Sequence, residues 1–331
     1  MISTPLKLTA ACGMIAAALC PALAAAQAAS TSSGQAYPTK VVRVLVPFAP
    51  GGGSDITARQ VSAKLTEQFK HQFVVDNRGG AAGLIGMEMV AKAPPDGYTI
   101  MMMSGSFSAS AATNKPAFDP INSIPGIAEF GITPFVLTVH PSLPPKTTKE
   151  FIALAKAKPD ALTYASTGMG GLTHMATELI LSMTGTQMVG VHYKSTGAAM
   201  SDLLAGQVPI IVGSLLPITP HVATGKLRAL GVTTAKRWYS LPNVPAISET
   251  LPGYEVELWF GAMGPRGTPL PIVTALNSAI NKALQEPDMK KNLDQQGMMP
   301  TGGTPQQFND RIRREYERWV KIVKERGIKV Q

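Results

Sequence analysis

Cysteine is almost absent from this sequence, and its scarcity excludes several kinds of site. Of the 331 residues only Cys12 and Cys20 are cysteines, and both lie in the apolar N-terminal stretch. If that stretch is cleaved, the remaining chain can form no disulfide and offers neither a thiol nucleophile nor a thiolate metal ligand. The five histidines are scattered along the chain, so we expect no metal site.

Long apolar runs are also missing beyond the N-terminus, although 45% of the residues are hydrophobic. We therefore expect a globular chain of two domains with a large core and no stable membrane insertion. Residues 1–26 are interpreted as a cleaved signal peptide, because Lys7 precedes an apolar run that ends in small residues suited to cleavage. An N-terminal membrane anchor fits less well, since Gly13 and Pro21 interrupt the run.

Recognised catalytic spacings do not occur either. The chain contains no nucleophile elbow G-x-S-x-G, no phosphate-binding loop with its lysine and no H-E-x-x-H pair. Two glycine loops approach the dinucleotide-binding pattern G-x-G-x-x-G, but Ile56 and Thr173 stand where the last glycine belongs. We expect neither an enzyme nor a bound cofactor.

The net charge is positive, with 30 Lys and Arg against 21 Asp and Glu, and much of the excess lies between Arg311 and Lys329. Apolar residues recur on one face of this segment, which predicts a docked helix with a solvated basic face and no nucleic-acid partner. The mild positive field favours small anionic ligands. The apolar residues are Ile312, Tyr316, Val320 and Val323, with Trp319 beside them.

The stretch from Pro47 to Asp55 follows an apolar run, Val41 to Val46, and precedes an amphipathic segment. This order predicts a strand, a glycine loop and a helix, whose unpaired N–H groups form a ready anion site. The glycines can equally serve only to tighten the connection, with Ser54 or Asp55 as the helix N-cap. A second strand, glycine loop and helix are expected around Thr167–Gly171.

Strands and helices alternate along the chain, which predicts an α/β protein with doubly wound, mostly parallel sheets. Ligands bind such sheets at the carboxyl ends of the strands, where the loops at Gly51, Gly80 and Ser104–Ser106 should gather. The strands expected at Phe135–His140 and Val256–Met263 would cross between two lobes. The expected boundaries are 37–136 with 257–331 for lobe 1 and 137–256 for lobe 2, with the ligand cleft between the lobes.

Two titratable side chains lie beside the glycine loops. Asp55 would repel an anion, so we interpret it as a cap that holds the first loop in place. His174 opens a helix beside the second loop, and it is equally suited to donate to a ligand or to cap and pack. An exported hydrolase or isomerase with His174 and Asp55 as acid and base is the alternative that uses the same cleft.

Short sequence blocks over essentially the whole mature chain carry a family resemblance. They are Pro47–Asp55, Asn77-Arg78, Gly83–Gly86, Pro95–Thr99, Ser166–Gly170 with His174, Tyr193-Lys194, Asp202–Leu204, Leu241–Pro245 and Trp259–Gly261. No single block is specific, but together they resemble the extracytoplasmic solute-binding receptors of tripartite tricarboxylate transporters, also called Bug receptors.

The resemblance implies a type II periplasmic binding protein of two lobes, each a doubly wound, mostly parallel sheet, that closes on a small carboxylate. It also implies that main-chain groups and waters at the two facing loops hold one carboxylate of the ligand. The residues that match this role are Phe48, Gly52, Ser54, Asp55, Thr167 and Gly168. Further ligand contacts are expected at Gly53, Ser104, Ser106, Met169, His174, Tyr193, Ser195, Thr196 and Asp202.

The expected function is therefore capture of an organic acid, a dicarboxylate, by a monomeric periplasmic protein. Lobe closure would bury the ligand, which the protein would hand to membrane permease subunits. A ligand-sensing adaptor for a signalling system would use the same site and differ only in its partner.

Overall fold

The computed structural model describes residues 1–2, 37–114 and 116–328, and those from Lys40 onward belong to one compact unit. The signal peptide expected over residues 1–26, with Cys12 and Cys20, lies outside the described residues apart from its first two positions. Within the described part of the chain, no helix combines the length and the apolar character needed to cross a membrane.

A single sheet forms the centre of this unit, with the strand order β2-β1-β3-β9-β4-β7-β5-β6. The short strand β10 and the strand β8 each pair with β4 outside that order. The strands are β1 (Val42–Val46), β2 (Phe73–Asn77), β3 (Thr99–Ser104), β4 (Gly126–Val139), β5 (Thr163–Ser166), β6 (Val189–His192), β7 (Ile210–Ser214), β8 (Arg228–Val232), β9 (Glu257–Met263) and β10 (Met299–Pro300).

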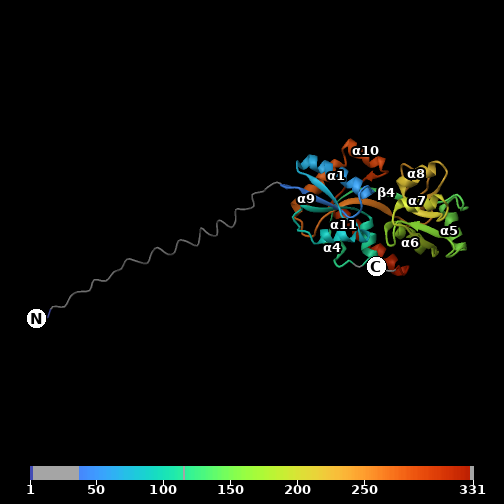
Figure 1. Cartoon of the computed structure of the whole chain (residues 1–331), viewed down its shortest axis with the longest axis horizontal. Helices are drawn as coiled ribbons and strands as arrows, with labels where there is room; N and C mark the ends of the chain where they lie inside the picture. Colours follow the sequence, from blue (N-terminus) through green and yellow to red (C-terminus); the bar gives the residue numbers. More distant parts are fainter. Residues whose placement is uncertain (3–36, 115, 329–331) are drawn as a thin grey trace. The chain divides into compact units, whose positions relative to one another are not determined.

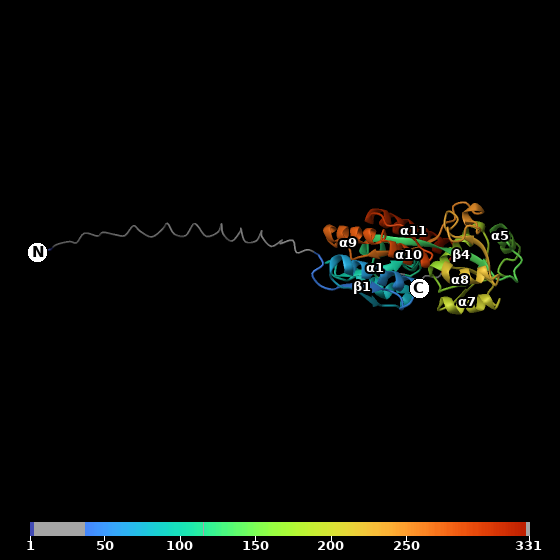
Figure 2. The same cartoon turned by 90° about the horizontal axis from the view of Figure 1, so that it is seen from above.

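β4 is the strand that joins the two halves of this sheet. Its first part, Gly126 to Pro134, pairs with β9, and its last part, Phe135 to Val139, pairs with β7 and β8. We call the strands β1, β2, β3, β9 and β10 the β1 half, and β5, β6, β7 and β8 the β5 half. Figures 1 and 2 show α1, α9 and α10 on one side and α5, α7 and α8 on the other, with β4 between them.

Helices connect the strands and cover the sheet. Most follow a strand directly, as the alternating pattern predicted. The helices are α1 (Gly53–Phe69), α2 (Leu84–Ala91), α3 (Ser106–Thr113), α4 (Pro120–Ser123), α5 (Thr148–Ala157), α6 (Leu172–Thr184), α7 (Thr196–Leu204), α8 (Leu215–Ala223), α9 (Leu270–Ala283), α10 (Pro287–Gln295) and α11 (Pro305–Glu325), with 3-10 turns η1 (Ala81–Gly83) and η2 (Ile247–Glu249).

The expected parallel arrangement is confirmed for the outer strands and needs correction at the centre. β1 is parallel to β2 and β3, and β5 is parallel to β6 and β7. β8, by contrast, pairs antiparallel with β4. The reason is that β4 lies between β7 and β8, so the connection through α8 passes over an inserted strand.

The crossing strand expected at Phe135 begins nine positions earlier, at Gly126. Every residue of β4 is buried, so its sequence lacks the alternation of a half-exposed strand. Glu129 in its middle is buried, but its carboxylate is paired: Arg311 Nε lies 3.0 Å from it and Thr301 donates to it at 2.7 Å. A buried charge is tolerated here because it is paired.

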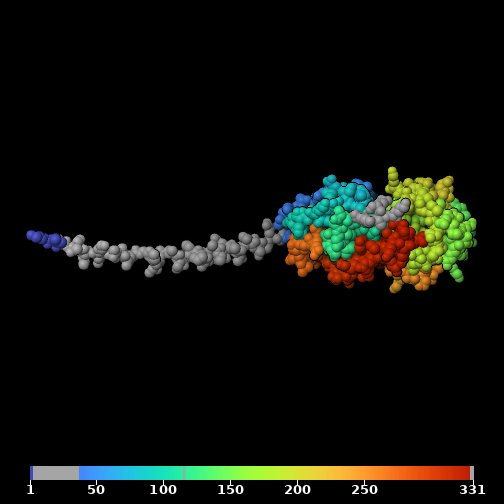
Figure 3. Space-filling view, turned by 90° about the horizontal axis from the view of Figure 1, so that it is seen from below, coloured from blue at the N-terminus to red at the C-terminus, as the bar shows by residue number. Residues whose placement is uncertain are grey.

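The C-terminal segment is a docked helix, α11, as expected, although its buried face is rotated. Trp319 is fully buried, whereas Val320, expected on the apolar face, is 42% exposed. The indole Nε1 of Trp259 on β9 donates to Glu315 Oε2 of α11 at 2.7 Å. Since α11 also contacts α3 and α6, it packs across both halves of the sheet (Figure 3).

The contact between β9 and α11 leaves no room for a side chain at Gly261. An added Cβ there would collide with the ring of Phe308 and come within 2.8 Å of the Ala128 carbonyl oxygen. Phe308 and Trp259 pack edge to face with centroids 5.0 Å apart, so neither ring can easily move away.

We predict that Gly261→Ala lowers the free energy of unfolding by about 1–3 kcal/mol, because the extra methyl overpacks this contact. Gly197→Ala, in the first turn of α7, is the matched control, since nothing lies within 4 Å of its added Cβ. Urea denaturation of both variants measures the difference. An equal loss in the two variants would contradict this account of the packing.

Candidate functional site

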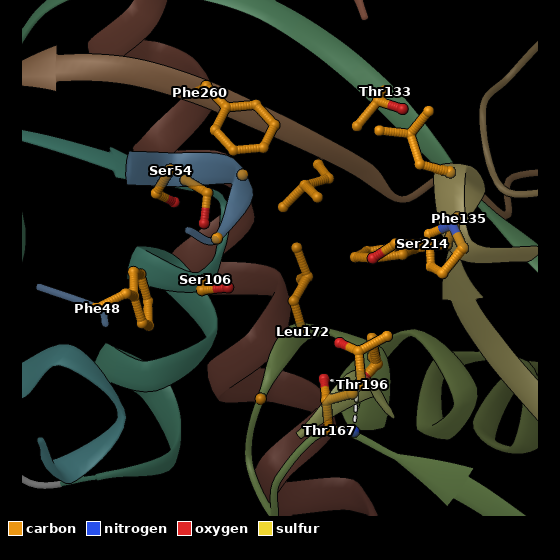
Figure 4. Close-up of a pocket in the computed structure, with 18 of the residues that line it drawn as sticks. Phe48, Ser54, Ser106, Thr133, Phe135, Thr167, Leu172, Thr196, Ser214 and Phe260 are labelled. Atoms are coloured by element: carbon orange, nitrogen blue, oxygen red, sulfur yellow. Dashed lines mark hydrogen bonds between the residues drawn. The ribbon is translucent and has the colours of Figure 1, made fainter. Parts of the chain in front are cut away.

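A cavity of about 720 Å³ lies between the β1 half and the β5 half of the sheet (Figure 4). Phe48, Ser54 and Ser106 lie on one side of it in the close-up, and Phe135 and Ser214 lie on the opposite side. Most of the lining residues follow the carboxyl ends of parallel strands or belong to the central strands β4 and β9, whereas Gln296 and Met298 lie between α10 and β10. This is the edge at which open α/β sheets bind ligands.

Helix N-termini surround this cavity. Among the described residues, α1, α3, α6, α7 and α8 each begin at its wall, with N-caps Gly52, Gly105, Gly171, Ser195 and Ser214. In α1, α3, α6 and α8 no side chain caps the first turn. Their first N–H groups have no partner within the helix, and the helix dipoles add partial positive charge. The cavity is therefore suited to an anion.

The side chains that line the cavity add little charge of their own. Of the described lining residues, Lys194 alone carries a full charge, and none is acidic. Hydroxyl groups supply most of the remaining polarity. They belong to Ser54, Ser104, Ser106, Ser110, Thr133, Thr167, Thr173, Thr196 and Ser214.

Asp55 holds the first glycine loop from behind and does not line the cavity. Its carboxylate accepts the Gly51 N–H at 2.9 Å and the Asn77 side-chain amide at 3.0 Å, and Arg59 lies 3.0 Å away. Burial raises the pKa of Asp55, but the hydrogen bonds from Arg59, Gly51 and Asn77 outweigh it and hold the pKa below its usual value. The anion-binding side of the loop is thus kept free of this negative charge.

The N-cap of α1 was expected at Ser54 or Asp55, and the structure corrects this to Gly52. The helix begins at Gly53, which makes Asp55 its third residue. From that position the carboxylate reaches back to Gly51, so it fixes the loop without capping the helix.

The second glycine loop is fixed by buried side chains beneath it. Gly170 adopts φ +74°, and an added Cβ would meet Thr113, whose hydroxyl donates to the Gly170 carbonyl at 3.1 Å. The Gly170 N–H donates to Nδ1 of His174 at 3.0 Å. Thr173 Oγ1 accepts the Thr167 N–H at 3.0 Å. His174 therefore helps to hold the loop in place. Its Nδ1 lone pair accepts the Gly170 N–H and is not free to accept a hydrogen bond from a ligand.

These features agree with the comparison to known proteins. The model of the tripartite tricarboxylate transporter family receptor matches residues 57–328. The chain belongs to this receptor family. Members of the family are solute-binding receptors, so the resemblance drawn from the short sequence blocks is confirmed.

Solved structures of similar proteins support the assignment to this receptor family. Rpa4515 of R. palustris with adipate is 36% identical, with a TM-score of 0.77 over 88% of this chain and 99% of that one. The periplasmic binding protein BugD is 31% identical, with a TM-score of 0.75 over 89% and 100%. MatC from Rhodopseudomonas palustris with bound malate is 30% identical, with a TM-score of 0.75 over 87% and 100%. The α/β fold of a periplasmic binding protein is thereby confirmed.

Many of the residues predicted to contact ligand line the cavity of this receptor. They come from four separate loops and converge from both halves of the sheet. These residues are Phe48, Gly52, Gly53, Ser54, Ser104, Ser106, Thr167 and Thr196.

The other predicted contacts lie outside the cavity lining. Tyr193 donates to Asp202 at 2.7 Å, and burial together with Asp202 raises the Tyr193 pKa to about 12. Ser195 is the N-cap of α7 and accepts the Ala198 N–H. Met169 is 47% exposed, and Gly168, which precedes it in the second glycine loop, adopts φ +111°. Asp55 and His174, considered above as base and acid, also lie outside the cavity lining. Each accepts a hydrogen bond from a main-chain N–H group of a glycine loop.

Sequence reasoning missed the apolar part of the lining. Leu215, Leu216 and Pro217 belong to α8, a helix that was not expected because Pro217 and Pro220 interrupt its pattern. Leu258 and Phe260 flank Trp259 on β9, and period-two alternation along that strand was the available signal. The remaining missed residues are Phe135, Leu172, Met298, Ser110, Thr133, Thr173, Lys194, Ser214 and Gln296, with smaller residues of the loops.

We predict that Asp55→Ala destabilises the receptor by about 1–3 kcal/mol, because the Gly51 N–H and the Asn77 amide lose a buried acceptor. Asp96→Ala is the control, since Asp96 also accepts a main-chain N–H, from Tyr98 at 3.0 Å, but in an exposed turn. Chemical denaturation at neutral pH compares the two variants. A loss no larger for Asp55→Ala than for Asp96→Ala would argue against its role as the support of the loop.

The buried imidazole of His174 makes stability depend on pH. Burial, the largest cause, lowers the pKa of His174 from 6.5 to about 4, although Glu178 acts in the opposite direction. Between these values the unfolded chain binds more protons than the folded one, so the free energy of unfolding falls as pH falls from about 6.5 to 4.

We predict that His174→Asn flattens this part of the pH profile, which thermal unfolding from pH 7 to pH 4 measures. His221→Asn, which changes a partly exposed histidine in the last turn of α8, should keep the profile of the unchanged protein. If His174→Asn retains the full acid dependence, the assignment of the transition to His174 is wrong.

Proposed function

We propose that this protein is a periplasmic receptor that binds a small organic carboxylate and delivers it to the membrane permease of a tripartite tricarboxylate transporter. The observation that carries the proposal is the convergence of uncapped helix N-termini on a cavity without an acidic lining residue in the described chain. A carboxylate placed there would accept main-chain N–H groups from both halves of the sheet.

Family membership supports both parts of this proposal. Family receptors bind small carboxylates and work with transporter components, and two of the similar proteins were solved with adipate and with malate. Location in the periplasm is supported by the similarity to the periplasmic binding protein BugD and by the signal peptide expected over residues 1–26. The protein would act there as a monomer.

Capture would occur by closure of two lobes, for which we propose residues 37–136 with 257–331 and residues 137–256. β4 passes from one lobe into the other, and β9 lies beside it, so these strands are suited to bend between an open and a closed state. Loops from both lobes would then contact one carboxylate. Those contacts are complete only when the lobes are closed, which is the difference that would drive the closure.

Binding by a main-chain amide can be separated from binding by a side chain at Ser54. Ser54 is the second residue of α1, where proline is tolerated because that N–H makes no intrahelical bond. We predict that Ser54→Pro weakens carboxylate binding by about 1.5–3 kcal/mol, or about tenfold or more, through loss of a hydrogen bond to a charged group.

The matched variant Ser54→Ala removes only the hydroxyl and should lose less affinity than Ser54→Pro. Calorimetric titration with a panel of aliphatic and aromatic carboxylates measures both variants against the unchanged protein. A ligand at about 100 times its Kd should also stabilise the receptor by about 2.7 kcal/mol. Failure of every carboxylate to bind or stabilise the protein would refute the proposed function.

A further inference from the structure

The wall of the cavity formed by β4, β9 and the start of α8 differs from the loop side. Phe135 belongs to β4, Leu258 and Phe260 belong to β9, and Leu215 and Leu216 belong to α8. In the close-up Phe135 lies across the hollow from Ser54, and Phe260 and Thr133 lie along its upper edge (Figure 4). We call these five residues, together with Met298, the apolar wall.

Two polar side chains near the β4 and β9 part of the apolar wall offer few free hydrogen bonds. Gln296 donates to Gln60 at 2.9 Å and to the Asn292 carbonyl at 3.1 Å, and its oxygen accepts from Thr57. The hydroxyl oxygen of Thr133 is buried without a partner and has almost no accessible surface. A ligand hydroxyl placed against Leu258 and Phe260, away from the start of α8, would lose its bonds to water without gaining others.

The positive charge of the lining belongs to the loop side. Lys194 stands between β6 and the N-cap of α7, next to Thr196, and it is not part of the apolar wall. If the ligand carboxylate binds at the uncapped starts of α1 and α6, as proposed above, the atoms that follow it would extend along Phe135, Leu258 and Phe260. The chemistry of the wall therefore selects what is attached to the carboxylate.

We propose that the ligand is a carboxylate whose body is a hydrocarbon chain or ring without hydroxyl groups. This proposal rests on the proposed function, and it narrows the ligand class of the same cavity. Short or hydroxylated acids would leave the apolar wall in contact with water or with an unpaired hydroxyl. A longer hydrocarbon body replaces that water, which favours binding.

The test is a calorimetric titration with two series of constant charge, acetate to octanoate and malonate to suberate, together with malate. In the series that binds more tightly, affinity should rise about fourfold for each methylene that becomes buried. Malate should bind more weakly than adipate. An affinity that is flat or falls with chain length, or a preference for malate, would overturn the proposal.

Leu216→Ser locates the effect within the cavity. Leu216 is 48% exposed, so the change should leave the fold intact while removing part of the apolar wall. It should reduce affinity for the six-carbon acid several-fold more than affinity for the shortest member of the series. Leu270→Ser is the matched control, because Leu270 is 75% exposed at the start of α9, outside the cavity lining.

Carboxylate binding and the preference for a hydrocarbon body can be refuted separately. If no acid of either series binds, the proposed function itself is wrong. If acids bind but show no gain with length, or if Leu216→Ser leaves that gain unchanged, the carboxylate site stands and the hydrocarbon-bodied ligand does not.

Discussion

The structure depends on main-chain N–H groups that the helices leave unpaired at their first turns. In α1, α6 and α8 these groups open toward the same cavity, and no side chain of the N-cap residue satisfies them. Glycine at Gly52 and Gly171 keeps the approach to the amides open. A cavity built in this way attracts an anion mainly through main-chain dipoles, with Lys194 as the one charged side chain among the described lining residues.

Each glycine loop is stabilised from the side that faces away from the cavity. Asp55 and Asn77 form hydrogen bonds behind the first loop, and Asn77 also donates to the Phe48 carbonyl at 3.0 Å. His174 and Thr113 hold Gly170 in the second loop from below. The titratable groups are therefore used for positioning, which leaves the cavity side to amides and hydroxyls. This division explains why side chains that look catalytic in the sequence contribute no acid or base to the cavity.

The sequence was sufficient to predict the local units of this fold. The apolar run before Pro47, the glycines and the helical spacing after them identified β1, its loop and α1, and the same logic identified β5, its loop and α6. These predictions succeed because strand, turn and helix signals act over short distances. The places of Ser104, Ser106 and Thr196 in the cavity lining followed from their positions after strands.

The features that sequence reasoning missed depend on long-range packing. β4 is buried along its whole length, so neither its start at Gly126 nor its place between β7 and β8 is marked by alternation. The buried acid Glu129 is paired with Arg311, which is far away in the chain, so the sequence alone does not show how its charge is compensated. The apolar wall was missed for the same reason, since Leu216 and Phe260 come together only when α8 and β9 meet across the cavity.

Backbone amide NMR during titration with a six-carbon carboxylate tests the central claim most directly. The account predicts saturable shifts at the N–H groups of Gly53, Ser54, Leu172 and Thr173, at the starts of α1 and α6, all with one dissociation constant. The same titration of Ser54→Pro should need more ligand for the remaining shifts. Saturable binding that leaves these amides unchanged, while signals elsewhere move, would contradict a carboxylate site built from helix N-termini.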